Sequence, residues 1–426
     1  MAKKTENIIA DHPLVAIDLG GGSVRTIAAE CTDDGLFQIL GVESSSRFSC
    51  VERGVVTNTS NAGYIVGELM KLLANRIHLN TLNKSFVVGG GQSMKIVEVS
   101  HKHNLVRKQE VEQFVLDNMD KECRKNIELH NPHAAVLDLV PSYYVLDGVA
   151  QDMPPTSTQR ASMIEVFYIA FVGKKELVQK IYESFIRIPK PIEQMYARPD
   201  ALLCALATDE DLVNGCAILD LGAQTSTLTI FKGNKYLYNK VVSQGGYDIT
   251  RAIEQFGISF AHAERLKCTY GWASQEMVQV NNLFRIPSVN PETGNVMIRA
   301  NELATLIEGR LNQMLDPIIA DLNTYADKIG VLYITGGGAM LNGIDAYIQQ
   351  KTSLPVMYGS HAPWLVADTP EDLYAPKYSS LIGALILGNQ NRENHPIEAQ
   401  DNDWTRHFNA WKKQIEQKTL DIFLNN

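Results

Sequence analysis

The chain has 426 residues, 45% of them hydrophobic, and a formal net charge of −9. A chain of this length can bury sizeable cores and predicts two or more domains, and its negative charge argues against nucleic acid as a partner. The six cysteines form no Cys-x-x-Cys pair, so we expect reduced thiols in a cytosolic protein. We expect neither a secretory signal nor a transmembrane helix, because no apolar run is long enough for either. Any membrane contact is therefore expected to be peripheral.

A glycine turn near the amino terminus carries the first chemical signal. An apolar strand, Leu14–Leu19, runs into three glycines, and a second strand, Val24–Ala29, follows. Glycines leave no Cβ in the turn, so its backbone N–H groups can surround a phosphate. An aspartate beside bound phosphate implies a divalent cation, with its waters, between the two. The candidate residues are Asp18, Gly20, Gly21, Gly22, Ser23 and Arg25. Taken alone, the turn is equally typical of a Gly-rich hairpin with a solvated aspartate.

The rest of the first 91 residues predicts a strand, a helix and a closing strand. The strand covers Phe37–Val42, and the helix follows Asn58. Its predicted buried stripe is Ile65, Leu69, Leu72, Leu73 and Ile77. The closing strand begins at Phe86 and ends in three glycines. Because no aspartate precedes these glycines, we interpret them as a structural turn rather than a ligand loop.

Residues 92–188 mix predicted helices and strands, which indicates a small inserted α+β module. The helices are expected over Lys108–Met119 and Lys174–Ile186, and the strands over Ala134–Tyr144 and Met163–Val172. The module's histidines are His101, His103, His130 and His133. Without carboxylates or cysteines at ligand spacing beside them, solvated loop histidines are favoured over a metal site. Residues 189–213 then return to the first lobe through a helix over Pro199–Leu206.

The first hairpin pattern occurs a second time in residues 214–244. Ala217–Ile230 repeats the strand, the Asp-Leu-Gly sequence, the small polar turn and the second strand, which indicates an internal duplication. Two such hairpins facing each other would clamp a phosphate. The candidate residues of the second hairpin are Asp220, Gly222, Gln224 and Thr225.

Three further patterns follow the second hairpin. Gly245, Gly246 and Asp248 open a helix, and Ala261–Gly271 predicts another. In that second helix Glu264 and Lys267 lie three residues apart on one face, a spacing usual for a solvated ion pair. Trp272–Asn295 is expected to be loops, and Asn301 is expected to cap a long helix.

A third glycine turn and a helix with one small face complete the second lobe. Strand Val331–Thr335 ends in a glycine turn where backbone could lie flat against a nucleobase or ribose. Its candidate residues are Gly336, Gly337, Gly338 and Met340. Helix Tyr378–Gly388 has a small face that suits close contact with another helix at the junction of the lobes. That face consists of Ser380, Gly383 and Ala384.

The carboxyl-terminal tail predicts a linker, 389–403, and an amphipathic helix, 404–426. The apolar stripe of this helix includes Trp404, Phe408, Trp411 and Ile415, flanked by cations that include Lys412 and Lys413. Aromatic residues on one face with cations beside them are typical of a helix lying on an anionic bilayer. A helix docked on the protein's own surface, or on another protein, fits the pattern equally well.

The three glycine turns, in this order and spacing, resemble the phosphate and adenosine motifs of the actin-like ATPase superfamily. Together with the inserted module, the Gly-Gly-Tyr-Asp turn and the Trp-x-x-x-Phe-x-x-Trp tail, nearly the whole chain resembles the bacterial cell-division FtsA family. The resemblance implies an α/β, actin-like two-lobed fold with duplicated βββαβα-type cores, an inserted small α+β domain and a C-terminal amphipathic helix. The second lobe would then comprise 214–244, a subdomain over 245–305, and 306–388 with the crossing helix.

The same resemblance implies a function at the cytoplasmic face of the inner membrane. Members of the family bind ATP, polymerise at the division septum, tether the tubulin-like protein FtsZ there and recruit later division proteins. Mg²⁺ would be held through waters by Asp18 and Asp220, and adenosine by Glu264, Lys267 and the third glycine turn.

The chain departs from the family pattern at three places. Gly21 stands where Ser or Thr is common, Ala223-Gln224 replaces Gly-Gly, and Thr227 replaces a frequent acid. Weak or no ATP hydrolysis is therefore expected. The alternatives are an actin-fold small-molecule kinase, which leaves the tail unexplained, and an actin-like pilus or secretion adaptor.

Overall fold

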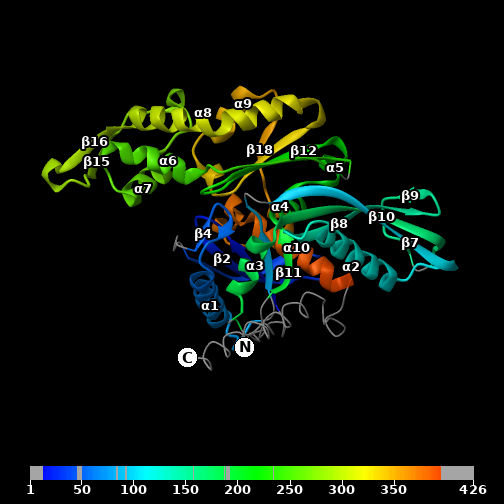
Figure 1. The fold of residues 1–426 in the computed structure, drawn as a ribbon. Coiled ribbons are helices and arrows are strands. Elements are labelled where there is room, and N and C mark those ends of the chain that lie inside the picture. Colours follow the sequence, from blue (N-terminus) through cyan, green and yellow to red (C-terminus); the bar gives the residue numbers. More distant parts are fainter. Residues whose placement is uncertain are drawn as a thin grey trace, which may run out of the picture.

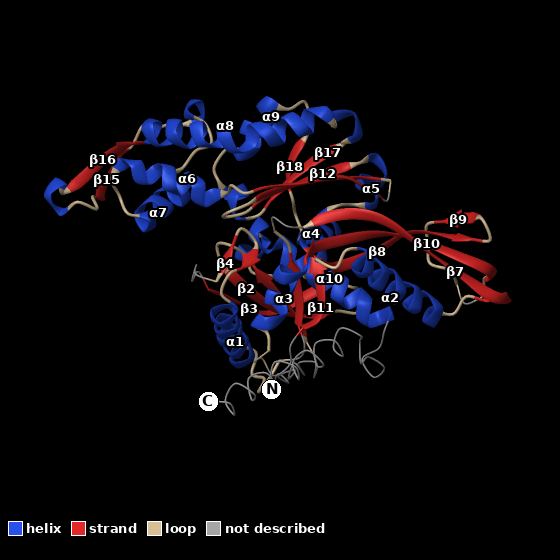
Figure 2. Cartoon of the chain, in the orientation of Figure 1, coloured by secondary structure: helices blue, strands red, loops and turns tan. Residues whose placement is uncertain are grey.

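The computed structural model describes residues 13–45, 50–82, 85–91, 94–156, 158–186, 188, 192–233 and 235–394. Two lobes stack on one another, and a smaller unit lies beside the first lobe (Figure 1). Each lobe is built on a five-stranded sheet with helices packed against it (Figure 2). This is the mixed α/β, two-lobed arrangement that the sequence predicts.

The sheet of the first lobe has β1 at its centre. In order across the sheet, its strands are β3 (Phe37–Ser45), β2 (Val24–Cys31), β1 (Leu14–Leu19), β6 (Ser85–Gly89) and β11 (Ile192–Ala197). Strand β1 pairs antiparallel with β2 and parallel with β6. All six of its residues are buried, which is why the strand reads as a nearly continuous apolar run.

Four helices and a short hairpin complete the first lobe. They are α1 (Thr59–Arg76), α3 (Lys175–Ser184), α4 (Arg198–Leu206), α10 (Ser379–Asn394) and the hairpin of β4 (Val51–Glu52) and β5 (Val55–Val56). Helix α1 packs on β2 and β3, while α10 packs on β1 and β6. Helix α1 begins directly after Asn58, as the sequence predicts, and the side chain of Asn58 caps it by accepting a hydrogen bond from the backbone of Asn61, 2.9 Å away. Leu72 of the predicted stripe is 51% exposed instead.

The sheet of the second lobe repeats the topology of the first. Its strands, in order, are β14 (Lys235–Val242), β13 (Ser226–Lys232), β12 (Cys216–Leu221), β17 (Val331–Thr335) and β18 (Val356–Tyr358). Strand β12 pairs antiparallel with β13 and parallel with β17, just as β1 pairs with β2 and β6. The internal duplication predicted from the two hairpins therefore extends to the whole sheet.

The remaining elements of the second lobe cover its sheet and form a projecting end. The helices are α5 (Asp209–Asn214), α6 (Gly246–Ile253), α7 (Phe260–Tyr270), α8 (Ala300–Thr324) and α9 (Ile344–Lys351). Strands β15 (Leu283–Pro287) and β16 (Asn295–Arg299) pair as a hairpin, where the sequence predicts loops only. The cap of α8 is Arg299, two residues before the predicted cap Asn301, and Glu302 accepts a hydrogen bond from the backbone N–H of Arg299.

The inserted unit is an antiparallel sheet with one helix, so it is α+β as predicted, but the second helix predicted for it is α3, which packs on α1 of the first lobe. Its strands, in order, are β7 (Lys95–Glu110), β10 (Arg160–Lys174), β8 (Ala134–Leu146) and β9 (Val149–Gln151), and its helix is α2 (Gln113–His130). The predicted helix start at Lys108 is wrong, because β7 continues to Glu110 through its pairing with β10. Likewise, His101 and His103 lie on that strand rather than in loops.

Helix α10 follows β18 of the second lobe and packs in the first, so it is the predicted crossing helix. Its small face lies against α4, and a Cβ on Gly383 would overlap the backbone carbonyl of Ala201. This contact explains the requirement for a residue without a side chain. The predicted linker and amphipathic tail lie outside the described residues. Within the described ranges, no helix is long and apolar enough to span a membrane.

Candidate functional site

The two predicted hairpins have the same geometry and face one another across the lobes. The backbone N–H of Gly20 donates to the carbonyl of Ser23 at 3.1 Å, and that of Gly222 donates to Thr225 at 2.9 Å. Each hairpin therefore turns through two residues. In each, the aspartate lies one register position before the end of its strand, since Asp18 pairs with Arg25 and Asp220 with Thr227.

A cavity of about 350 Å³ lies between the lobes and brings most of the predicted residues together. The predicted residues that line it are Asp18, Gly20, Gly21, Gly22, Ser23, Arg25, Asp220, Gly222, Gln224, Thr225, Gly246, Glu264, Lys267, Gly336, Gly337, Gly338 and Met340. They come from five separate stretches of the chain, so only the fold assembles them. A cavity of this size is typical of a small-molecule site.

Gly245 and Asp248 do not line the cavity. The carboxylate of Asp248 accepts a hydrogen bond from the backbone N–H of Gly245 at 2.9 Å and lies 3.5 Å from a guanidinium nitrogen of Arg310. These contacts fix the first turn of α6. The same turn presents Gly246 and Tyr247 to the cavity.

The lining of the cavity carries more cations than carboxylates. Arg25, Arg198, Lys267 and Lys377 face Asp18, Asp220 and Glu264. This local excess of positive charge contrasts with the net charge of −9 on the whole chain. A cavity of that charge lined by glycine turns suits an anionic ligand.

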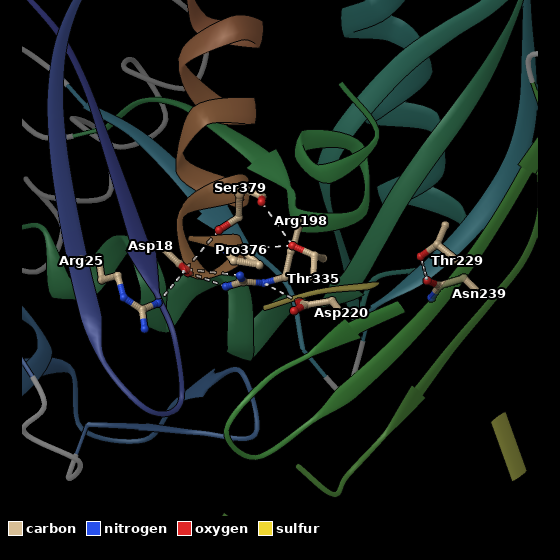
Figure 3. A network of polar contacts seen from close by, with 10 residues as sticks. Asp18, Arg25, Arg198, Asp220, Thr229, Asn239, Thr335, Pro376 and Ser379 are labelled. Carbon is tan, nitrogen blue, oxygen red and sulfur yellow. Dashed lines mark hydrogen bonds and ion pairs between the residues drawn. The ribbon is translucent and has the colours of Figure 1, made fainter. Parts of the chain in front are cut away.

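Sequence reasoning missed Arg198, which lies between the two aspartates (Figure 3). Its Nη1 is 3.3 Å from Oδ2 of Asp18, its Nη2 donates to Oδ1 of the same carboxylate, and its Nε is 4.0 Å from Oδ2 of Asp220. Arg198 is the first residue of α4, 180 positions along the chain from Asp18. No local pattern marks such a residue, because its partners meet it only in the folded chain.

The charges of this group are mutually dependent. Burial alone would raise the pKa of Asp18, but the charge and hydrogen bonds of Arg198, with Arg25 and Ser380, hold it below its ordinary value. Burial raises the pKa of Asp220, because the charge of the more distant Arg198 offsets burial only in part. Although burial disfavours the charged guanidinium, the two carboxylates raise the pKa of Arg198. Asp18 and Arg198 therefore form a buried ion pair.

The start of α10 closes the site behind Asp18. The hydroxyl of Ser380 donates to Oδ2 of Asp18 at 3.2 Å. One residue earlier, the hydroxyl of Ser379 lies 3.2 Å from the hydroxyl of Thr335 (Figure 3). The same hydroxyl lies 3.1 Å from Nδ1 of His361. Thr335 ends β17, directly before the third glycine turn. The crossing helix thus connects the first aspartate to the third turn.

The predicted Mg²⁺ site between Asp18 and Asp220 does not fit this arrangement. Mg²⁺ keeps most of its waters, so aspartates that hold it through those waters need carboxylate oxygens free to accept hydrogen bonds from them. Both oxygens of Asp18 are engaged by Arg198, one of them also by Ser380, and the side chain is 2% exposed. The guanidinium of Arg198 lies within 4.0 Å of both carboxylates that would hold the ion. Elsewhere in the described part of the chain, no group of three or more His, Cys, Asp or Glu side chains is placed to hold a metal ion.

The predicted Glu264/Lys267 pair joins α7 to α6 at the edge of the cavity. Nζ of Lys267 is 2.7 Å from Glu264, 2.9 Å from the carbonyl of Gly246 and 2.9 Å from the hydroxyl of Thr250. Lys267 is 9% exposed, so the pair is not the solvated surface pair that its spacing alone suggests. The ammonium group is positioned by three oxygen acceptors beside the glycines of α6.

The glycines that end β6 also face the cavity. Gly90 and Gly91 line it together with Gly54, although the sequence favours a purely structural turn at this place. A Cβ on Gly90 would lie 3.2 Å from Cβ of Arg198. The glycine leaves the space in which the arginine side chain begins.

Comparison with known proteins agrees with the predicted family. The family model described as "Cell division protein FtsA" matches residues 217–383. The cell division protein FtsA of Shigella flexneri is 22% identical over 427 residues, covering 96% of this chain and 95% of that protein.

Two solved structures have the same fold. A chain of the PilM–PilN type IV pilus biogenesis complex is similar with a TM-score of 0.61 at 16% identity, covering 88% of this chain and 98% of that one. MreB5 of Spiroplasma citri bound to ADP has a TM-score of 0.50 at 13% identity, covering 92% and 99%. At these identities the likeness shows an actin-like fold and nothing further.

Proposed function

We propose that this chain, which is similar to the cell division protein FtsA, is an adenine-nucleotide-binding division scaffold. The observation that carries the proposal is the cavity between the duplicated hairpins. Its glycine turns, its excess of cations and its volume of about 350 Å³ suit a nucleoside di- or triphosphate. ADP in the MreB5 structure of the same fold supports this class of ligand.

Within this proposal each part of the cavity has a role. The hairpin turns Gly20–Ser23 and Gly222–Thr225, with Arg25, hold phosphates. Lys267 and the third glycine turn hold the nucleoside. Ligand contacts to both hairpins would favour the closed arrangement of the lobes, since a ligand shifts an equilibrium through its differential affinity.

We further propose that the closed form polymerises at the cytoplasmic face of the inner membrane at the division septum. The tail helix, with Trp404, Phe408 and Trp411, would attach it to anionic lipid. Many weak tail helices on one filament act together as an avid surface. The filament would tether FtsZ and recruit later division proteins, with weak or no ATP hydrolysis.

Vesicle cosedimentation tests the scaffold. The full chain and a chain ending at Gln400 are mixed with phosphatidylglycerol-containing vesicles and FtsZ, with and without ATP. We expect the full chain to pellet with the vesicles, more so with ATP, and to carry FtsZ with it. A matched variant, Lys71→Ala, changes an exposed cation of α1 and should pellet normally.

Two outcomes would contradict the proposal. If the truncated chain pellets as well as the full one, the tail is not the membrane anchor. If the full chain pellets without retaining FtsZ, the protein is an adaptor with another partner, as the pilus alternative predicts. Phosphoryl transfer from ATP to a small molecule would instead favour the kinase alternative.

A further inference from the structure

The backbone around Arg198 positions its side chain. Arg198 follows β11, whose last residue, Ala197, pairs with Gly89 of β6. The next glycine, Gly90, leaves room for the side chain, since a Cβ there would lie 3.2 Å from Cβ of Arg198. The guanidinium is therefore directed between the two hairpins by neighbouring strands rather than by a surface loop.

The guanidinium neutralises charge where the duplicated hairpins bring two carboxylates together. Asp18 is 2% exposed, and Asp18 and Asp220 both lie within 4.0 Å of Arg198. Asp220 beside it is 13% exposed. A buried acid with a second, largely buried acid next to it requires a counter-charge, because an unpaired buried charge is strongly unfavourable. Arg198 supplies this counter-charge from within the chain.

A guanidinium has five N–H donors, and the bidentate contact with Asp18 uses two of them. The side chain also lines the cavity and is 21% exposed. Donors therefore remain for a ligand, and a guanidinium is suited to phosphate oxygens.

We propose that Arg198 takes the place of a divalent cation, so that this chain binds its nucleotide as the free polyanion rather than as a magnesium complex. The inference rests on the proposed nucleotide function and deepens it by naming the form of the ligand. A hydrated dication added beside the guanidinium would repel it and would compete with it for Asp18. Arg198 is here a binding residue whose charge replaces that of the metal.

The test measures ATP affinity in Mg²⁺ and in EDTA by titration calorimetry. The full chain is compared with Arg198→Met, which keeps much of the side-chain volume without the charge. We expect the unmodified chain to differ by less than about threefold between the two conditions. The Arg198→Met variant should bind at least about tenfold more weakly in EDTA and should recover with Mg²⁺.

Two further variants test whether the effect on ATP binding depends on the position of the lost charge and on the charge itself. Lys377→Met removes a cavity cation that the structure does not pair with either aspartate and should weaken binding equally in both conditions. Arg198→Lys retains a cation and should keep the binding independent of Mg²⁺. Circular dichroism of each variant monitors folding, and Arg198→Gln, which also lacks the charge, carries the test if Arg198→Met does not fold.

Three outcomes overturn the inference. ATP binding by the unmodified chain that falls about tenfold or more in EDTA overturns it while leaving the proposed function intact. A folded Arg198→Met variant without any gain in Mg²⁺ dependence also overturns it. Absence of ATP and ADP binding in both conditions overturns the proposed function and this inference together.

Discussion

Oε1 of Gln224 lies 2.7 Å from the backbone nitrogen of Arg53 and accepts its hydrogen bond across the cleft between the lobes. The same side chain faces Gly21, where an added Cβ would lie 2.8 Å from Oε1. On the neighbouring residue, a Cβ on Gly22 would lie 2.6 Å from Cβ of Ala223. Gly21 and Ala223-Gln224, two of the departures from the family pattern, are thus complementary. The first hairpin lacks side chains where those of the second hairpin lie.

Gln224→Ala should weaken the contact between the lobes. Removing the acceptor leaves the N–H of Arg53 to solvent and costs about 1 kcal/mol in the free energy of unfolding. The specific measurement is hydrogen exchange at the Arg53 amide, which should become faster. Gln38→Ala, a change of an exposed glutamine on β3, is the control. Unchanged exchange at Arg53 in the Gln224 variant would contradict the contact.

Gly22→Ala should force the two hairpin turns apart. Its new methyl group meets Ala223 at 2.6 Å and the hydroxyl of Tyr247 at 3.3 Å, so ATP affinity should fall, by about tenfold. The second substitution Ala223→Gly removes the facing methyl group and should restore part of that loss. Additive effects of the two changes would show that the turns do not touch.

Gly383→Ala should destabilise the packing of the crossing helix. The new Cβ overlaps the carbonyl of Ala201 on α4, which costs about 1–3 kcal/mol of stability. Gly67→Ala on α1 is a matched change, because a Cβ at Gly67 meets nothing within 4 Å. That control should be neutral or stabilising by up to about 1 kcal/mol, since alanine favours helix. Urea unfolding of both variants measures the difference, and equal midpoints would contradict the close contact.

Ionisation of the buried Asp200 carboxyl group should lower the free energy of unfolding as pH rises from about 4 to 7. Asp200 is 5% exposed and accepts a hydrogen bond from the hydroxyl of Tyr236 at 2.9 Å. Burial raises the pKa of Asp200 from 3.8 to about 7, and the charge of Asp138 adds to the rise. The folded state therefore binds more protons than the unfolded state in this window, so deprotonation favours unfolding. Asp200→Asn, which carries no charge, should lose less stability between about pH 5 and pH 8.

Comparing the unmodified chain with the Asp200→Asn variant isolates the contribution of the Asp200 carboxyl group to the pH dependence of stability. Burial lowers the pKa of His361, so the folded state binds fewer protons below the ordinary value of 6.5 and stability from this group rises with pH. The contribution of His361 to the pH dependence opposes that of Asp200, but the unmodified chain and the Asp200→Asn variant share it. Urea unfolding at each pH measures the difference, and parallel pH profiles would show that Asp200 is not the group responsible.

The local elements of the site were predictable because their signals lie within a few residues. Strand β1 coincides with the predicted Leu14–Leu19, and Asp18 and Asp220 were recognised from strand, carboxylate and glycine in succession. The duplication was visible because both hairpins keep this pattern. In contrast, the hairpin of β15 and β16 was missed, since Leu283–Pro287 is stabilised by pairing with Asn295–Arg299 rather than by its own periodicity.

The fold class, the duplicated hairpins and many of the residues that line the cavity follow from the sequence alone, because short-range patterns specify strands, turns and glycine positions. Which charges meet is set only in the folded chain. Arg198 stands between Asp18 and Asp220, and Gln224 reaches Arg53, over separations that no local pattern encodes. Electrostatic energy depends on distance in space, so the replacement of a metal site by a guanidinium becomes visible only when the two lobes are brought together.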